Sequence, residues 1–179
     1  MSFIVCADVT LALAAGRYKT AFPGHEPFWR FWTAAGDSAW WFAGSIGGWL
    51  ACRALAKRSS SASGWLCGKA WCAGMFTVLA VSGIVLNLLK ILFARARPRM
   101  LYRQGLYGFS GFVVDSDYGS FPSGHATTAF AVAGVLSAAL PRWRRVWIAG
   151  AGLVGASRMV LGSHYAADVV AGAALGGVC

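Results

Sequence analysis

The stretch Ala70–Leu89 reads AWCAGMFTVLAVSGIVLNLL and contains no charged side chain. A helix needs about 20 apolar residues to cross the hydrocarbon core of a bilayer, so this stretch predicts a membrane span. The whole chain has the same character, because 58% of its 179 residues are hydrophobic and 12% are charged. That charge content is about half of what an ordinary soluble domain carries.

Shorter apolar runs predict further helices around this span. They are Phe3–Ala15, Ala39–Cys52, Ala126–Leu140, Val146–Ser157 and Val160–Cys179. The expected fold class is therefore all-α, a polytopic membrane bundle of about six transmembrane helices forming one domain over residues 1–179. No basic region precedes the first run, so a cleaved signal peptide is not expected. We interpret this run, which carries Asp8, as a first span; a helix lying on the membrane surface is the alternative.

Basic residues without acidic neighbours gather in two loops and predict the orientation. The first loop has Arg53, Lys57, Arg58 and Lys69, and the second has Arg142, Arg144 and Arg145. Two predicted spans separate these loops, so both face the same side, which the positive-inside rule makes cytoplasmic. The net charge of +10 is thereby explained by topology, and no nucleic-acid partner is expected. The segment Arg17–Ser38, with its aromatic cluster, is expected to lie along the opposite membrane surface.

Three short blocks bring ionisable groups into or beside these spans. They are Lys90 with Arg97-Pro98, then Pro122-Ser123-Gly124-His125, and finally Ser157-Arg158 with His164 and Asp168. The predicted topology puts all three blocks on the extracytoplasmic side. Ionisable groups are costly within membranes, so they indicate a functional site. Three cations, two imidazoles and one carboxylate suit a phosphate, and the cations would repel a divalent metal; no metal or cofactor is expected.

The first two blocks are each ambiguous when taken alone. Lys90 and Arg97, with other arginines nearby, could bind a phosphate or simply extend to lipid headgroups. Ser123 is interpreted as a helix N-cap, and Gly124 would let backbone amides approach an anion at a helix N-terminus. His125 then lies in the first turn, where it could protonate a leaving oxygen or serve only as a capping group.

The third block offers a nucleophile. His164 and Asp168 are four residues apart, which places them on one face of a helix. The carboxylate could then accept a proton from one imidazole nitrogen and leave the other nitrogen to attack, as in a Ser-His-Asp triad whose histidine is itself the nucleophile. The alternative is a structural hydrogen bond between the two side chains. Arg158 could reach the same anion across a short turn.

Together, in this order and spacing, the three blocks resemble the signatures of the type 2 phosphatidic acid phosphatase family. That family shares a superfamily with vanadium haloperoxidases and bacterial acid phosphatases, and the resemblance covers residues 90–168. It implies a phosphohistidine on His164, oriented by Asp168, with His125 as general acid and then base. It also implies a set of ligands for the phosphoryl oxygens: Lys90, Arg97, Arg158, Ser123 and the Gly124 amide.

The expected activity is that of a membrane lipid phosphatase, a metal-independent phosphoric ester hydrolase. By resemblance, its candidate substrates are phosphatidylglycerophosphate, phosphatidic acid, undecaprenyl diphosphate and lipid A 1-phosphate. Its expected partners are the lipid phosphate and the bilayer, and its expected place is a bacterial inner membrane with the site facing the periplasm. A lipid phosphotransferase and a non-catalytic phospholipid-binding or transport module are the alternatives. Haloperoxidase activity is disfavoured by the predicted spans.

Overall fold

The computed structural model describes residues 3–58 and 63–179, and most of this part of the chain is helical. Its α-helices are α1 (Phe3–Ala21), α2 (Glu26–Ala35), α3 (Ser38–Ala56), α4 (Ser63–Phe93), α5 (Pro98–Gln104), α6 (Gly124–Ala139), α7 (Arg144–Val160) and α8 (Ala166–Val178). The 3-10 turns η1 (Pro23–His25) and η2 (Pro141–Trp143) lead into α2 and α7. The predicted all-α fold class is confirmed.

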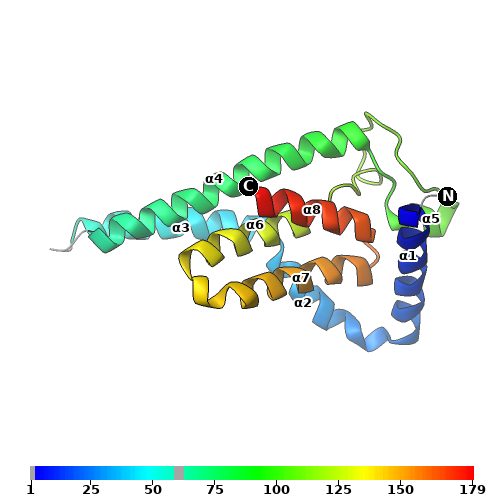
Figure 1. The fold of residues 1–179 in the computed structure, drawn as a ribbon, viewed down its shortest axis with the longest axis horizontal. Helices are drawn as coiled ribbons and strands as arrows, with labels where there is room; N and C mark the ends of the chain where they lie inside the picture. The colour runs from blue at the N-terminus through cyan, green and yellow to red at the C-terminus, as the bar shows by residue number, and fades with distance from the viewer. Residues whose placement is uncertain (1–2, 59–62) are drawn as a thin grey trace.

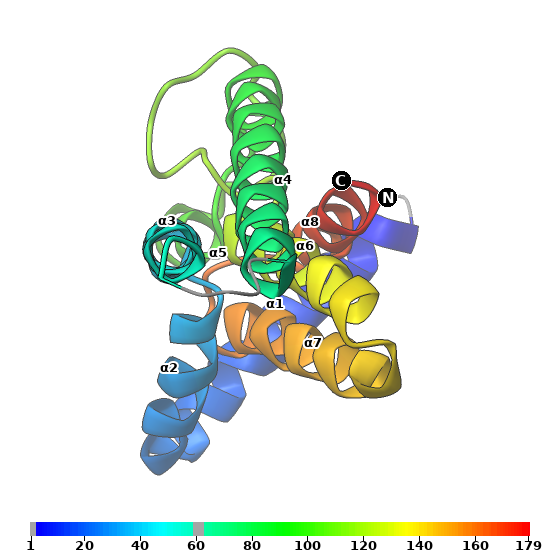
Figure 2. The same cartoon turned by 90° about the vertical axis from the view of Figure 1, so that its left-hand side faces the viewer.

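The helix α6 lies at the centre of a bundle that also contains α3, α4, α7 and α8 (Figures 1 and 2). It packs against α4, α7 and α8, and α3 packs along α4. Two apolar clusters fill these contacts: Ala129, Ala133, Ala151 and Val154 between α6 and α7, and Met75, Leu79 and Val132 between α4 and α6. Alanine predominates in the first cluster, so the backbones of α6 and α7 approach closely.

Glycines let α8 approach the start of α6. A Cβ on Gly172 would lie 2.5 Å from the Ser123 carbonyl oxygen, and one on Gly176 would meet the Thr127 carbonyl oxygen. A Cβ on Gly48 of α3 would lie 2.9 Å from the Cys72 sulfur of α4. Small residues in membrane helices commonly serve such packing. Gly44 lies four residues before Gly48 on α3, but no neighbouring atom lies within 4 Å of its Cβ position.

Apolar side chains cover the outside of the bundle. Ile84 and Leu88 on α4 are each 63% exposed, although both are large and hydrophobic. Of the described helices, α4 is long and apolar enough to cross a bilayer, whereas α6 and α8 are apolar but shorter. An outer surface of this kind suits a lipid surrounding better than water.

The helix α1 runs across the end of the bundle and not along it (Figure 1). It continues beyond Ala15 to Ala21 and packs against α7 and α8. Figure 2 shows the same crosswise path behind the bundle helices. This orientation favours the surface-lying helix over the first span that we expected from the sequence, and the total of about six spans stays a prediction.

The basic loops and the signature blocks lie at opposite ends of the bundle. Arg53 lies in the last turn of α3, and Arg142 lies in η2, at the end where α6 turns into α7. The segment 94–123, which follows α4, lies at the other end with the start of α8 (Figure 1). The separation expected from the charge pattern is therefore present in the fold.

Candidate active site

The first block lies where α4 gives way to α5. Lys90 is in the last turn of α4, and Arg97 precedes α5 with an extended backbone (φ −74°, ψ 158°). Pro98 explains this break, because a residue before proline disfavours helical geometry. Arg97 Nε donates to the Ser116 carbonyl at 2.7 Å, and its backbone N–H donates to the Asp117 carbonyl at 2.9 Å. The loop before α6 thus holds the Arg97 side chain in place.

The second block opens α6. Ser123 is the N-cap residue, as predicted, although its side chain makes no capping hydrogen bond. Its buried Oγ has no hydrogen-bond partner among the described residues, and its backbone N–H donates to the Asp168 carbonyl at 3.0 Å. A Cβ on Gly124 would lie 3.8 Å from Lys90 Nζ. The lysine of the first block therefore lies beside the glycine of the second.

The helix α2 covers the side of the site that contains His125 and Arg158. Arg158, in the last turn of α7, donates from Nη1 to Thr33 Oγ1 of α2 at 2.6 Å. A Cβ on Gly36, which follows α2, would lie 3.0 Å from His125 Cβ. Thr33 has no motif around it, and sequence reasoning missed it.

His164 lies in the loop between α7 and α8, with its ring oriented by the backbone. The Nδ1 atom is 2.8 Å from the Ser120 carbonyl oxygen. A carbonyl oxygen can only accept a hydrogen bond, so this contact assigns the proton to Nδ1 and the lone pair to Nε2. Within the described chain, Nε2 makes no hydrogen bond. His164 thus has the tautomer that a nucleophile requires.

Asp168 is close to His164, but the two do not share a helix face. The helix α8 begins at Ala166, so His164 precedes it and the predicted stacking on one face is wrong. Asp168 Oδ2 is 3.7 Å from His164 Nδ1, and it accepts hydrogen bonds from Ser120 Oγ at 2.6 Å and the Tyr165 N–H at 2.9 Å. As the third residue of α8, Asp168 therefore caps the start of its own helix.

A buried ion-pair network that we did not predict supports Asp168. Arg95 Nη1 donates to Asp168 Oδ1 at 2.5 Å, and Nη2 donates to Asp8 Oδ2 of α1 at 2.7 Å. From the sequence, Arg95 was only one of several basic residues near Arg97. Asp8 offered a signal, since a lone carboxylate in an apolar run needs a partner. Its partner lies 87 residues away, beyond any local pattern.

The cations of the first and third blocks are close enough to interact electrostatically with one another. Lys90 lies within electrostatic reach of Arg97 and Arg158, and these two arginines also act on each other. His125 lies within reach of Arg158, Lys90 and His164. The structure therefore brings the predicted site residues of all three blocks together.

The surroundings of His164 keep its imidazole neutral. Burial lowers the pKa of His164, the Asp168 carboxylate acts in the opposite direction, and the positive charges of Arg97 and Arg158 add to the lowering. Because an unperturbed histidine already titrates near pH 6.5, the lowered pKa leaves His164 uncharged at neutral pH. A neutral imidazole can attack phosphorus, whereas an imidazolium cannot.

A cavity of about 590 Å³ lies against this cluster, between α3, α4 and α6. Lys90, Gly124 and His125 line it at one end, and Phe42 and Leu79 line it further along α3 and α4. The cavity therefore combines the Lys90 cation with apolar side chains, and Asp37, Asn87 and Thr128 add polar groups to its wall. That combination suits an amphiphile with an anionic headgroup.

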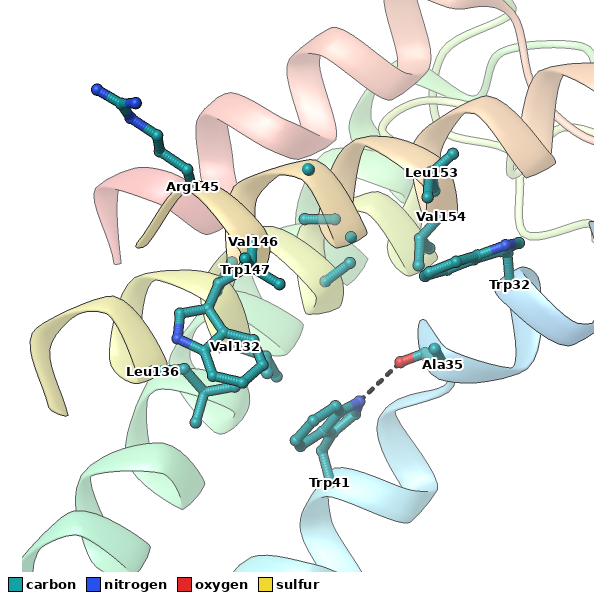
Figure 3. Close-up of a pocket in the computed structure, with 15 residues that line it drawn as sticks. Trp32, Ala35, Trp41, Val132, Leu136, Arg145, Val146, Trp147, Leu153 and Val154 are labelled. Atoms are coloured by element: carbon teal, nitrogen blue, oxygen red, sulfur yellow. Dashed lines mark hydrogen bonds between the residues drawn. The ribbon is translucent and has the colours of Figure 1, made fainter. Parts of the chain in front are cut away.

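A second cavity, of about 570 Å³, lies between α2, α3, α6 and α7 (Figure 3). Its wall is almost wholly apolar and includes Trp32, Trp41 and Trp147, with Arg145 at one end. The Trp41 indole N–H donates to the Ala35 carbonyl at 2.7 Å. None of the predicted site residues lines this cavity, whereas Lys90, Gly124 and His125 line the first one.

Comparisons with known proteins agree on one family. Residues 71–179 match the model of the PAP2 superfamily. A lipid A 1-phosphatase of Rhizobium etli is 37% identical over 153 residues, which are 81% of this chain and 64% of that protein. The lipid A 1-phosphatase of Rhizobium johnstonii is 36% identical over 80% of this chain and 60% of its own length. The chain thus spans less than two thirds of either relative.

Solved structures show the same fold. The transmembrane PAP2-type phosphatidylglycerolphosphate phosphatase of Bacillus subtilis aligns with a TM-score of 0.70 over 99% of this chain and 83% of that one, at 23% identity. LpxE of Aquifex aeolicus aligns with a TM-score of 0.62 over 86% of this chain and 81% of that one, at 22% identity. The family model covers more than half of the chain, and the two solved structures share its fold. The chain belongs to the PAP2 superfamily.

Proposed function

We propose that the chain is an integral-membrane lipid phosphatase that hydrolyses a lipid phosphate monoester or diphosphate through a phosphohistidine on His164. The observation that carries this proposal is the contact between His164 Nδ1 and the Ser120 carbonyl, which leaves the Nε2 lone pair available. Arg97 and Arg158 lie within electrostatic reach of the same ring and can hold a phosphoryl group against it.

The reaction proceeds in two displacements. His164 Nε2 attacks phosphorus, the N–P bond forms and the ester P–O bond breaks, while His125 protonates the departing oxygen. Water then attacks phosphorus, His125 accepts its proton, and the N–P bond breaks to release phosphate. Asp168 stabilises the positive charge on the phosphorylated imidazole.

Preorganised donors stabilise the charge that spreads over the phosphoryl oxygens. The donors are Lys90, Arg97 and Arg158, together with the Ser123 hydroxyl and the Gly124 amide. The unpartnered, buried Ser123 Oγ supports this assignment, since a bound phosphoryl oxygen would satisfy it.

Among the candidate substrates, lipid A 1-phosphate has the strongest support, because two relatives that are more than a third identical to the chain are named lipid A 1-phosphatase. Phosphatidylglycerophosphate, phosphatidic acid and undecaprenyl diphosphate remain candidate substrates. The cavity beside Lys90 supports a lipid of any of these kinds, with the phosphate near Lys90 and the chains along the apolar residues of α3 and α4.

The site is proposed to face the periplasm of a bacterial inner membrane. The basic residues at the other end of the bundle support this orientation, because positive loops are retained on the cytoplasmic side. The lipid phosphate would then enter from the leaflet of the inner membrane that faces the periplasm.

The test is a panel of the four lipid phosphates incubated with the purified protein in detergent, with inorganic phosphate as the readout. We expect release with at least one substrate and none from the His164→Ala variant. Phosphate that appears only on an added acceptor lipid would identify a phosphotransferase. Binding without turnover in the unchanged protein would identify a binding module, and equal turnover by His164→Ala would exclude the phosphohistidine.

A further inference from the structure

Arg95 is a buried guanidinium that joins two helices far apart in the chain. It donates to Asp168 of α8 at 2.5 Å and to Asp8 of α1 at 2.7 Å. It also donates to the Tyr107 hydroxyl at 2.6 Å. Arg95 and Asp8 are each 2% exposed, and Asp168 is fully buried. Burying three charges is costly even when they are paired, so this arrangement needs a reason beyond packing.

Asp8 makes a second contact that fixes the start of α8. Its Oδ1 accepts a hydrogen bond from the backbone N–H of Ala167 at 2.9 Å. The first N–H groups of a helix have no partner within the helix, and a carboxylate there also favours the helix dipole. Asp8 therefore holds the turn from which Asp168 projects, both directly and through Arg95. In this way α1, which carries no signature residue, becomes part of the site.

An aromatic enclosure keeps the guanidinium in one orientation. Its central carbon lies 4.5 Å from the centroid of the Tyr165 ring and 5.1 Å from those of Tyr107 and Phe109. Arginine suits such a place because its planar group can stack on rings while donating to two carboxylates. Lysine would keep the charge but could not bridge both carboxylates in this geometry.

The network determines the charge beside His164. Arg95 alone would neutralise Asp168, but Asp8 leaves the three groups with one net negative charge close to the imidazole. Among the described residues, other charged or titratable groups that act on the ring are Arg97 from the loop before α5, Arg158 from α7 and His125 from α6. These groups are cationic or neutral. The net negative charge of the network is thus what opposes them when His164 becomes positive.

We propose that Asp8 and Arg95 are positioning residues for the reaction: they orient the Asp168 carboxylate toward His164, and Asp8 supplies the charge that stabilises the phosphorylated imidazole. This inference rests on the proposed phosphohistidine function. Neither residue touches the phosphoryl group, so both act through Asp168.

Asp8→Asn tests the charge with little change of shape. Without the Asp8 charge, the protonated His164 is less stable, so its pKa falls and neutral His164 persists to lower pH. In the pH profile of kcat/KM, measured on one lipid phosphate, the acid limb is the range where kcat/KM falls as His164 becomes protonated. The midpoint of this limb should move down by about half a pH unit or more. The phosphorylated imidazole loses the same support, so kcat should fall about tenfold while KM changes by less than about twofold. Asp8→Glu keeps the charge and should retain the acid limb of the unchanged protein.

Arg95→Lys tests the geometry at constant charge. Asp168 should lose its fixed orientation, so kcat should fall about tenfold or more while the acid limb stays in place. Glu26→Gln is the matched control, because Glu26 pairs with Lys19 and Arg30 away from the site. It removes one carboxylate near the same end of the chain and should leave kcat and the acid limb unchanged.

Thermal unfolding in detergent, followed by tryptophan fluorescence, shows whether each variant is folded. If Asp8→Asn or Arg95→Lys does not fold, Tyr107→Phe decides, since it removes one hydroxyl from the network and should lower kcat about threefold with KM retained. The inference is overturned if the folded variants, or Tyr107→Phe in their place, match Glu26→Gln in both kcat and acid limb. It is also overturned if they change KM alone. If the unchanged protein releases no phosphate from any lipid, the proposed function fails instead.

Discussion

At the scale of single residues, the chemistry of the site depends on which atom each side chain contacts. The residue types and their order in the chain predicted the phosphate ligands, the two histidines and the carboxylate. The sequence could not show that a backbone carbonyl, that of Ser120, orients His164, because backbone acceptors have no residue signature. Nor could it pair Arg95 with Asp8, because local spacing carries no information about partners 87 residues apart.

Thr33 should matter for phosphate binding, although it lies outside every motif. Thr33→Val keeps the shape of the side chain but removes the hydroxyl that accepts from Arg158. With that partner lost, Arg158 is less well oriented, and kcat/KM should fall by about tenfold. Thr33→Ser keeps the hydroxyl and should retain most of the activity. Equal kinetics for the valine and serine variants would show that the hydroxyl does not position Arg158.

The lowered pKa of His164 gives a pH prediction. Burial disfavours the imidazolium, so the nucleophile stays neutral below the ordinary histidine pKa of about 6.5 and is lost only as the pH falls through the lowered value. The log of kcat/KM against pH should therefore keep its plateau into mildly acidic solution, once the titration of the substrate phosphate is allowed for. If, after this allowance, kcat/KM falls on the acidic side with a midpoint above about pH 6.5, a buried, neutral His164 is contradicted.

At the scale of elements, the approach of α8 to α6 determines where the site residues lie. The apolar run Ala126–Leu140 and the Pro-Ser-Gly-His block before it predicted where α6 begins. The start of α8 was harder, because the four-residue spacing of His164 and Asp168 fits a helix that begins earlier. The actual helix begins at Ala166 because Asp168 caps the Tyr165 N–H instead of pairing along a helix face.

Gly172 and Gly44 offer a matched pair of substitutions. Gly172→Ala would place a methyl group 2.5 Å from the Ser123 carbonyl oxygen, which must push α8 away from α6. We expect a loss of about 1–3 kcal/mol in stability, seen as a lower melting temperature, together with reduced activity. Gly44→Ala meets no atom within 4 Å and should be neutral or slightly stabilising. The same melting temperature for both variants would argue against the close contact of α6 and α8.

At the scale of the whole molecule, charge is separated between the two ends of the bundle. Loop charges and apolar runs predicted this separation and the all-α membrane fold. They did not predict the crosswise α1, because an apolar run of this length fits a span and a surface helix equally well. The direction of α1 is decided by tertiary contacts with α7 and α8.

The orientation can be tested with two single cysteines in a chain whose native cysteines are replaced by alanine. Val114 is 85% exposed in the loop at the site end, and Arg142 is exposed at the basic end. In intact cells, a membrane-impermeant maleimide that reaches the periplasm should label Val114→Cys. It should label Arg142→Cys only after the cells are opened. The reverse pattern would place the site in the cytoplasm.

The central claim is a covalent intermediate on His164, and a His125→Ala variant can accumulate it. A lipid diphosphate has a good leaving group, so its attack needs little help from an acid, while hydrolysis of the phosphohistidine still needs the missing base. After incubation with a lipid diphosphate labelled on its terminal phosphate, the account predicts acid-labile phosphate on His164, and none in the His125→Ala/His164→Ala double variant. Turnover of the substrate with no label on the protein, or with label on another residue, would contradict it.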